Sequence, residues 1–515
     1  MGSAAQPIQS CITISMTTHA IILGGILKDQ TGRPLGPYRL RTALAKDGFR
    51  AEVIDYAWAL REDELLILLQ RYISKDTLIL GISNVWFTTN AEKNNEDLNR
   101  WFTEKFFQVV KRKWPWVKIV IGGTKTTLLQ GAELLKSPAD WWLSGFADIG
   151  LPKLLKFLSG QETDLKFRTD ADGTHIVNCD SHYRVVNMDD LETVYEAADR
   201  FHSFQPITLE VSRGCIFTCS FCAHPFLGKK SFEYIRTPES LAAELKRNYD
   251  LFGTTRYIIT DDTFNDSMEK LERVARAIEL SKIPNFEFVS YIRAELLVTK
   301  PEMVPMLKQL NCKGSFVGLE SLNKEARKII GKGMDAERVI SALENFKSAT
   351  NTKIFASMIV GLPGDSLDDA YSWSERFKKE KLFSEWGFQN LGMNFDEFGQ
   401  GDSIFSKDPA KYGYAVSTNK NKGAQRSYNW THQLGYTDKD AAQVANDINS
   451  QGRELAKAAG FGVAEYWFHG GSNDDIENVT RKTFSVGGRG SDNGRLRAKI
   501  RVQEARDYLG NLLKP

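Results

Sequence analysis

The chain has 515 residues, of which 42% are hydrophobic and 26% charged, and its formal net charge is +2. This length allows several domains with a large core, and the composition is that of an ordinary soluble globular protein. So small a net charge gives no reason to expect nucleic acid or a membrane surface as the main partner. Six cysteines in so long a chain do not form a disulfide scaffold, which favours free thiols in a reducing cytoplasm.

Residues 1–15 lack the basic start and long apolar core of a signal peptide. They are expected to be a disordered leader. Residues 16–160 then alternate short apolar runs with amphipathic stretches, which is typical of a doubly wound, Rossmann-like α/β domain. The predicted strands are residues 20–24, 51–55, 77–82, 118–121 and 141–143. The predicted helices are residues 38–46, 62–73, 95–111 and 151–158.

Sheets of this kind bind ligands at the carboxyl ends of their strands. Glycines and small polar residues gather at these ends, although each glycine taken singly is equally consistent with a tight turn. The candidate binding residues of this domain are Gly25, Ser83, Asn84, Gly122, Gly123, Thr124 and Gly145. The polar segment 161–205 that follows is predicted to be a linker, with a small hairpin at residues 175–177 and 183–186 and a surface loop around Cys179.

Strand–helix alternation resumes over residues 206–393. Strands are predicted at residues 207–211, 256–260, 286–291, 314–319, 353–360 and 387–391, with helices at residues 238–249, 267–280, 301–310, 335–349 and 367–379. Barrels built from such units place their chemistry at the carboxyl ends of the strands. The loops after these strands are therefore where binding residues are expected.

Three cysteines, Cys215, Cys219 and Cys222, follow the first of these strands in a C-x3-C-x2-C spacing. Thiolates are soft ligands that suit iron–sulfur clusters and zinc. A four-iron cluster normally takes four cysteines, and no fourth is near, so one iron would be left open for another ligand. Zinc sites usually combine two ligand pairs, whereas Cys312 stands alone downstream. The spacing favours a [4Fe–4S] cluster over a zinc knuckle.

This spacing resembles the signature of the radical S-adenosylmethionine (SAM) superfamily, in which SAM chelates the fourth iron. The segments GLES at 318–321 and GLPGDS at 361–366 resemble the fourth and fifth strand ends of that family. The resemblance implies a partial (β/α)6 TIM-type barrel that cleaves SAM reductively. It also implies that SAM is bound by Phe221, His224, Asp262, Arg293, Glu320, Ser321, Gly361 and Pro363.

Structural roles stay open for three of these SAM candidates. Asp262 suits an Asx turn or a helix N-cap, and Arg293 could form a surface ion pair with Glu295. His224 could offer only its backbone to the adenine. The GLPGDS turn alone is weak evidence, but in register with the cysteines and the GLES strand it supports the resemblance over nearly the whole of residues 206–392.

The segments LGISNVWFTTN, VKIVIGGTKTT and ADWWLSGFAD, at 80–90, 117–127 and 139–148, resemble the cobalamin-binding domain that precedes many radical SAM domains. The resemblance implies cobalamin as a third cofactor, bound at the candidate residues of the first domain. Two departures stand against it. Residues 145–148 lack the second glycine of the family's Gly-x-Gly-Glu segment, and the Asp-x-His-x-x-Gly motif is absent. The alternative is that the first domain has the fold of a cobalamin-binding domain but binds no cobalamin.

Residues 394–515 are predicted to be a mainly helical region, which by the resemblance caps the barrel and shapes the substrate pocket. The expected function is methylation of an unactivated carbon of a small molecule or peptide, with an electron donor such as flavodoxin or ferredoxin. Oxidation, cyclisation or rearrangement without methylation remains an alternative, as does a non-catalytic cluster-binding protein. Methylthio transfer is disfavoured, since the first domain lacks a second cysteine triad.

Overall fold

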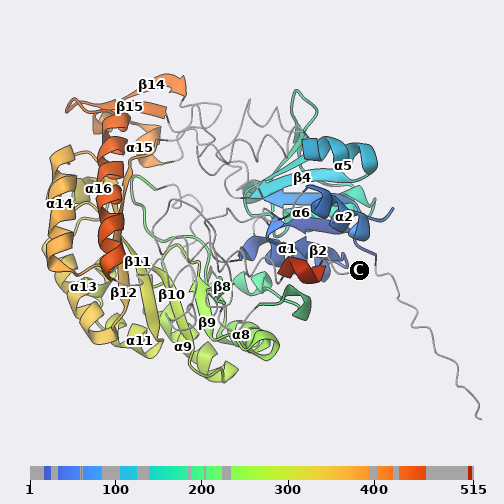
Figure 1. Cartoon of the computed structure of the whole chain (residues 1–515), viewed down its shortest axis with the longest axis horizontal. Helices are drawn as coiled ribbons and strands as arrows, with labels where there is room; N and C mark the ends of the chain where they lie inside the picture. The colour runs from blue at the N-terminus through green and yellow to red at the C-terminus, as the bar shows by residue number, and fades with distance from the viewer. Residues whose placement is uncertain are drawn as a thin grey trace, which may run out of the picture.

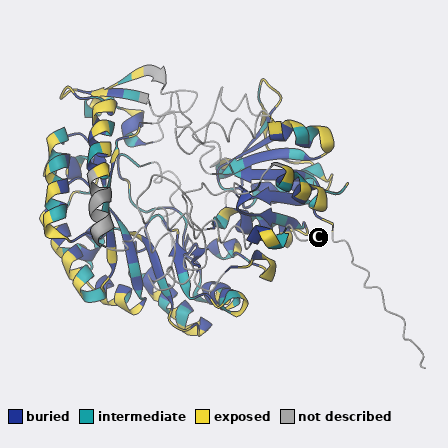
Figure 2. Cartoon of the chain, viewed as in Figure 1, coloured by how far each residue is buried: buried dark blue, intermediate teal, exposed yellow. Residues whose placement is uncertain are grey.

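The computed structural model describes residues 17–24, 33–57, 60, 62–83, 105–123, 139–183, 185, 187–201, 205–222, 234–393, 403–420, 428–459 and 508–512. In these ranges two large sheets form two α/β units that lie beside each other (Figure 1). The strands of both units are largely buried beneath helices with exposed outer faces (Figure 2). Within the same ranges no helix combines the length and apolar character needed to cross a membrane.

The first sheet has the strand order β2-β1-β3-β4-β5-β7-β6. Its strands are β1 (Ala20–Leu23), β2 (Ala51–Ile54), β3 (Ile79–Ser83), β4 (Lys118–Gly123), β5 (Trp141–Ser144), β6 (Arg168–Thr169) and β7 (His175–Asn178). Its helices are α1 (Leu35–Lys46), α2 (Glu62–Tyr72), α5 (Phe107–Lys113) and α6 (Gly150–Leu158). Alternate strand residues face opposite sides, so Ile22 packs in one core with Tyr38 and Leu23 in another with Leu68. The doubly wound prediction is confirmed.

This sheet extends beyond the predicted boundary at Gly160. Strand β7 pairs in parallel with β5, and β6 pairs with β7 in the antiparallel sense. The short helix α7 (Cys179–His182) follows, and the Cys179 side chain is buried against Gly150 rather than lying in a surface loop. The sequence predicts residues 175–177 as one strand of a small hairpin with residues 183–186, whereas β7 pairs with β5 and β6. Ile176 and Val177 pack in different cores on its two faces.

The second sheet has the order β13-β12-β11-β10-β9-β8, and every neighbouring pair is parallel. Its strands are β8 (Ile207–Leu209), β9 (Arg256–Ile259), β10 (Glu287–Ile292), β11 (Cys312–Glu320), β12 (Lys353–Val360) and β13 (Glu385–Asn390). Its helices are α8 (Pro238–Phe252), α9 (Met268–Ser281), α10 (Ala294–Thr299), α11 (Met303–Gln309), α12 (Lys324–Ile329), α13 (Ala336–Thr350) and α14 (Leu367–Glu380). The predicted partial barrel is confirmed.

Side-chain caps explain where these helices begin. Thr237, Ser267 and Asp335 each accept a hydrogen bond from a backbone N–H in the first turn of α8, α9 and α13. Ser366 and Asp369 form a reciprocal capping box at the start of α14. Caps of this type satisfy donors that would otherwise lack a partner.

The sixth helix of the barrel lies beyond the predicted boundary at residue 393. Helix α16 (Asp438–Ala459) packs against β13, where the Asn449 side chain exchanges two hydrogen bonds, of 2.9 and 2.8 Å, with the backbone of Phe388. It also contacts α14, because the Tyr371 hydroxyl donates to Asp447 at 3.2 Å. In Figure 1, α16 stands beside α14 on the outside of the barrel.

A short helix and a hairpin separate β13 from α16. These are α15 (Ile404–Lys407), β14 (Tyr414–Lys420) and β15 (Tyr428–His432), with the two strands antiparallel. The described part of the C-terminal region is therefore not only helical, and α16 belongs to the barrel rather than to a separate cap. Since this insertion places the helix far from its strand in the sequence, proximity along the chain could not reveal the pairing.

Residues 508–512 return to the first unit (Figure 1). The Tyr508 hydroxyl donates to the Val53 carbonyl of β2 at 2.9 Å, and its ring lies 4.7 Å from the Arg33 guanidinium carbon. The sequence predicts this segment within a region that caps the barrel. It instead covers the β2 side of the first sheet, where Tyr56 and Tyr508 pack edge to face.

Trp430 fastens the β14–β15 hairpin to the barrel, and replacing it tests this packing. The indole is 1% exposed, its Nε1 donates to the Leu391 carbonyl at 3.0 Å, and its ring lies over Gly361. Because Trp430→Ala leaves a large cavity, we expect it to lower the free energy of unfolding by about 3–5 kcal/mol in denaturant titrations. Leu434→Ala, at a 61% exposed position, is the control and should have little effect. Equal losses for both variants would contradict this packing.

Candidate functional site

The loop that carries the three cysteines is tied at its start to the neighbouring strand. Asp261, directly after β9, accepts hydrogen bonds from the backbone N–H of Val211 and Ser212 at 2.9 and 3.0 Å, and from the Ser212 hydroxyl at 2.6 Å. All three groups are buried. This contact determines where the chain leaves β8 and enters the cysteine loop.

A buried lysine supports Asp261 from below. The Lys270 ammonium lies 3.3 Å from Asp261 Oδ2 and 3.0 Å from Asp266 Oδ2, and it donates to the Thr263 carbonyl at 2.8 Å. Burial raises the pKa of Asp261, and the lysine opposes this effect. The ammonium therefore compensates two carboxylates that would otherwise be buried without a counter-charge.

Asp262, the predicted SAM ligand, lies next to this network and is half-buried. It does not cap the following helix, since Ser267 accepts the capping hydrogen bond of α9. Its neighbour Thr263 places its hydroxyl 3.4 Å from the Cys215 sulfur. The strand end is thus adjacent to the cysteine loop, and the role of Asp262 toward SAM stays a prediction.

The three cysteines lie together on the loop after β8. Cys219 is buried, Cys215 and Cys222 are half-buried, and none of them forms a disulfide. A turn closes the loop, with the Cys222 N–H donating to the Cys219 carbonyl at 3.1 Å. An iron–sulfur cluster is held by cysteine thiolates.

The far side of the cysteine loop rests on the turn after α12. The Ser220 N–H donates to the Ile330 carbonyl at 3.2 Å, and its hydroxyl donates to the Ile329 carbonyl at 2.9 Å. Gly331, with φ +77°, passes so close that a Cβ there would lie 3.4 Å from the Thr218 carbonyl oxygen. Glycine suits this position on both counts, because it tolerates positive φ and leaves room for the loop.

Arg293 directs its guanidinium at the cysteine loop. It donates to the Cys219 sulfur at 3.3 Å and to the Gly331 carbonyl at 3.2 Å. The ion pair with Glu295 that the sequence left open is present at 3.4 Å, and it is largely buried rather than on the surface. Arg293, one of the predicted SAM-binding residues, is thus engaged by the protein itself.

Glu320 ends β11 in an unusual conformation. Its φ is +66°, at a register shift in the pairing with β12, and its carboxyl folds back over Gly318, where a Cβ would collide with it. Burial raises the pKa of Glu320 to about 7, although the nearby Lys332 ammonium acts against the rise. Near neutral pH this group can therefore hold or release a proton at the fourth strand end.

The fifth strand end is joined to the fourth and covered by the hairpin. Ser321 donates to Asp365 Oδ1 at 2.9 Å, and burial raises the pKa of Asp365 to about 8. The Gly361 carbonyl accepts from the Tyr414 hydroxyl at 2.6 Å. Pro363 is buried beside it. Asp365 lies in the predicted GLPGDS segment but was not among the predicted site residues. Tyr414 was also missed, because only tertiary packing brings it to this strand end.

The predicted cobalamin residues that the structure describes gather at one edge of the first sheet. Ser83 pairs with Gly122, Gly123 pairs with Ser144, and the Gly145 N–H donates to the Gly123 carbonyl at 3.2 Å. Gly145 has φ +96°, and a Cβ there would collide with the Asp180 carboxylate. Tight packing therefore also accounts for that glycine. Gly25, Asn84, Thr124 and His224, like residues 1–15, lie outside the described residues.

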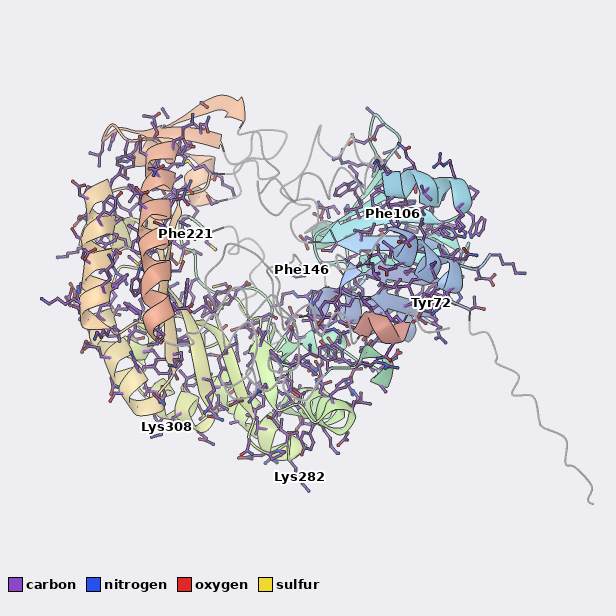
Figure 3. The ribbon with its side chains drawn as sticks, viewed as in Figure 1. Tyr72, Phe106, Phe146, Phe221, Lys282 and Lys308 are labelled. Carbon is purple, nitrogen blue, oxygen red and sulfur yellow. The ribbon has the colours of Figure 1, made fainter. Side chains whose placement is uncertain are left out.

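A buried ion-pair network joins this edge to the cysteine loop. Arg213 lies 2.7 Å from Asp148, after β5, and 2.8 Å from Glu210, after β8. Its guanidinium carbon is 4.0 Å from the Phe146 ring centroid, and Figure 3 places Phe146 at the side of the first unit that faces the second. Arg39 of α1 pairs with Glu210 at 2.8 Å. Burial raises the pKa of Glu210, but the two guanidinium groups outweigh it and bring the pKa to about 2.

Residues 209–373 match the family model described as the Radical SAM superfamily. The chain is 26% identical over 196 residues to ribosomal protein uS12 methylthiotransferase RimO of Sulfurimonas denitrificans, covering 36% of this chain and 42% of that protein. It is 24% identical over 328 residues to tRNA-2-methylthio-N(6)-dimethylallyladenosine synthase of Corynebacterium glutamicum, covering 59% and 57%. The chain thus spans about half the length of these curated relatives.

Two solved structures resemble nearly the whole chain. One is the radical SAM methyltransferase TsrM of Kitasatospora setae with cobalamin and a [4Fe–4S] cluster bound, with a TM-score of 0.61, 13% identity and coverage of 95% of this chain and 100% of that one. The other is the cobalamin-dependent radical SAM enzyme OxsB with aqua-cobalamin bound, with a TM-score of 0.61, 13% identity and coverage of 97% and 72%.

At these identities the likeness concerns the fold. Residues 209–373 form a radical SAM domain, as the cysteine spacing predicts. Together with the first unit, this domain gives the chain the fold of cobalamin-dependent radical SAM enzymes. The predicted fold class is confirmed, and residues 209–373 match the predicted superfamily.

The raised pKa of Glu320 gives a testable dependence of stability on pH. A folded pKa of about 7 lies above the ordinary value of 4.5, so the stabilisation is complete below pH 4.5 and is lost as pH rises through 7. Relative to Glu320→Gln, the wild-type free energy of unfolding should fall by about 3 kcal/mol between pH 4 and pH 8, since one pKa unit is worth about 1.4 kcal/mol. Urea titrations of the ligand-free proteins at these two pH values measure the free energies of unfolding. Glu325→Gln, an exposed neighbour, is the control, and a flat difference for Glu320→Gln would contradict the prediction.

Proposed function

We propose that this chain is a radical SAM enzyme that also binds cobalamin and methylates an unactivated carbon of a small molecule or peptide. The observation that carries the proposal is the Asp148–Arg213–Glu210 network, because it joins the carboxyl ends of strands in both sheets. Parallel sheets bind ligands at these ends. A ligand at the edge of the first sheet would therefore face the cysteine loop of the second.

The residues present suit the three cofactors. Cys215, Cys219 and Cys222 would hold the cluster, and the polar strand ends at Asp262, Glu320 and Ser321 would bind SAM. The backbone at Ser83, Gly122 and Gly123 would contact the corrin. When bound, the cluster would supply the electron that cleaves SAM, and cobalamin would carry the methyl group. The chain's own residues bind and orient them, and a low-potential donor such as flavodoxin or ferredoxin would supply the electron.

Methylthio transfer is the second candidate, because the curated relatives named above are methylthiotransferases. The cysteine inventory weighs against it. Outside the loop the chain has three cysteines, Cys11, Cys179 and Cys312, so no second triad lies in the first unit. Cys179 and Cys312 are buried in separate units, and burial raises the pKa of each thiol to about 12. Such thiols are poor metal ligands, since the thiolate is the binding form.

Cleavage of SAM is the first test. Anaerobically reconstituted protein with dithionite and SAM should release 5'-deoxyadenosine, measured by chromatography. Cys219→Ala should abolish the release, because one thiolate of the cluster is lost. Cys312→Ala removes a buried cysteine far from the loop and should retain the release. A wild-type protein with an intact cluster and no release under any reductant would instead favour a non-catalytic cluster-binding protein.

Cobalamin binding is tested separately by corrin absorption. Protein purified with cobalamin supplied should show the corrin band in the visible spectrum. Ser83→Tyr places a large side chain at the carboxyl end of β3 and should reduce the bound corrin at least tenfold. Ser159→Tyr, exposed at the far end of α6, is the matched control. Absence of the corrin band in folded wild-type protein would rule out the cobalamin-dependent reaction and leave a cobalamin-independent one.

A further inference from the structure

The backbone of Arg293 is held in place by hydrogen bonds that do not involve its own side chain. Its N–H donates to Asn265 Oδ1 at 2.8 Å, and its carbonyl accepts from Asn265 Nδ2 at 3.1 Å. Asn265 is fully buried. The reciprocal pair fixes the backbone between β10 and α10, so the guanidinium has a defined starting point from which it reaches the cysteine loop.

Each nitrogen of the Arg293 guanidinium is already engaged by the protein. Nη1 donates to the Cys219 sulfur, Nη2 to the Gly331 carbonyl, and Nε pairs with Glu295. The planar group also stacks on Phe217, with its carbon 3.8 Å from the ring centroid. Phe217 belongs to the cysteine loop itself. A cation stacked on an aromatic face is stabilised electrostatically, so loop and arginine hold each other in position.

The surroundings of Arg293 are positively charged on balance. Glu295 is the shared anion, and the cations within 4 Å of it are Arg293, Arg327 and Lys332. Burial alone would raise the pKa of Glu295, but these three cations outweigh burial and lower the pKa. Glu320 is a second carboxyl near the same three cations, so at most two negative charges face three positive ones beneath the cysteine loop. The Cys219 sulfur is the group on the loop that receives a hydrogen bond from this cluster of charges.

We propose that Arg293 raises the reduction potential of the cluster through Cys219, as a positioning and charge partner of the sulfur rather than as the ligand of the SAM carboxylate. The inference rests on the cluster of the proposed function. Reduction adds one electron, supplied by the external donor, so the cluster and its thiolates become more negative by one charge. A cation 3.3 Å from a ligand sulfur stabilises that reduced form more than the oxidised one. Hydrogen bonds to the cluster sulfurs also raise the reduction potential.

The experiment compares midpoint potentials in the absence of SAM, by redox titration followed with electron paramagnetic resonance. Arg293→Gln removes the charge and should shift the midpoint potential to more negative values at unchanged iron content. Arg293→Lys keeps the charge without the planar guanidinium, and its midpoint potential should lie between those of the wild type and Arg293→Gln. Arg276→Gln makes the same charge change at a 59% exposed side chain on α9 and is the control. Its potential should equal that of the wild type.

SAM affinity, measured on the same samples, separates the two roles. If Arg293 binds the SAM carboxylate instead, Arg293→Gln weakens SAM binding and leaves the SAM-free potential unchanged, and that result overturns the inference. Should Arg293→Gln fail to take up four irons, Phe217→Leu provides the second variant. Phe217→Leu frees the guanidinium from the ring and should shift the midpoint potential to more negative values, by less than Arg293→Gln would. An unchanged midpoint potential in Phe217→Leu also overturns the inference. A wild-type protein that binds no cluster would refute the proposed function itself.

Discussion

The guanidinium of Arg213 is the contact on which the arrangement of the two sheets depends. It bridges Asp148 of the first unit and Glu210 of the second, immediately before the cysteine loop begins. Charges buried in this way are stable only when paired, and loss of one partner typically costs about 3–5 kcal/mol. The network also explains why an acid stands at residue 148. The segment departs from the family's Gly-x-Gly-Glu pattern, yet its carboxylate meets the arginine that leads into the cysteine loop.

The cysteine loop is held on several sides by groups from distant parts of the chain. Asp261 anchors its start, the turn at Gly331 supports its far side, and Arg293 reaches its central cysteine. A loop that must wrap a cofactor has few hydrogen bonds of its own, so its shape has to come from neighbouring elements. The buried Lys270 belongs to the same support, since it compensates the charge of Asp261. Such a preformed loop loses little conformational freedom when a cofactor binds.

Much of the fold could be predicted because its signals are local and periodic. Buried parallel strands appear as apolar runs, and both sheets follow the predicted alternation. The errors arose where an element's partner is remote in sequence. Strand β7 was predicted within a local hairpin but pairs with β5 across α6, and α16 is separated from β13 by an inserted hairpin. Of the candidate site, the sequence identified the cysteines and the strand ends, but it could not identify Tyr414 as a neighbour of the fifth strand end.

The sequence by itself determined the chemistry that neighbouring residues define: three thiols at a cluster-forming spacing, and strands that end in polar turns. Only the tertiary structure decided which charges meet. It showed that Asp261 rather than Asp262 anchors the loop, and that Arg293 contacts the Cys219 sulfur. The physical reason is that a side chain's partner depends on how strands and helices pack, and contacts between residues 74 positions apart leave no periodic trace in the chain.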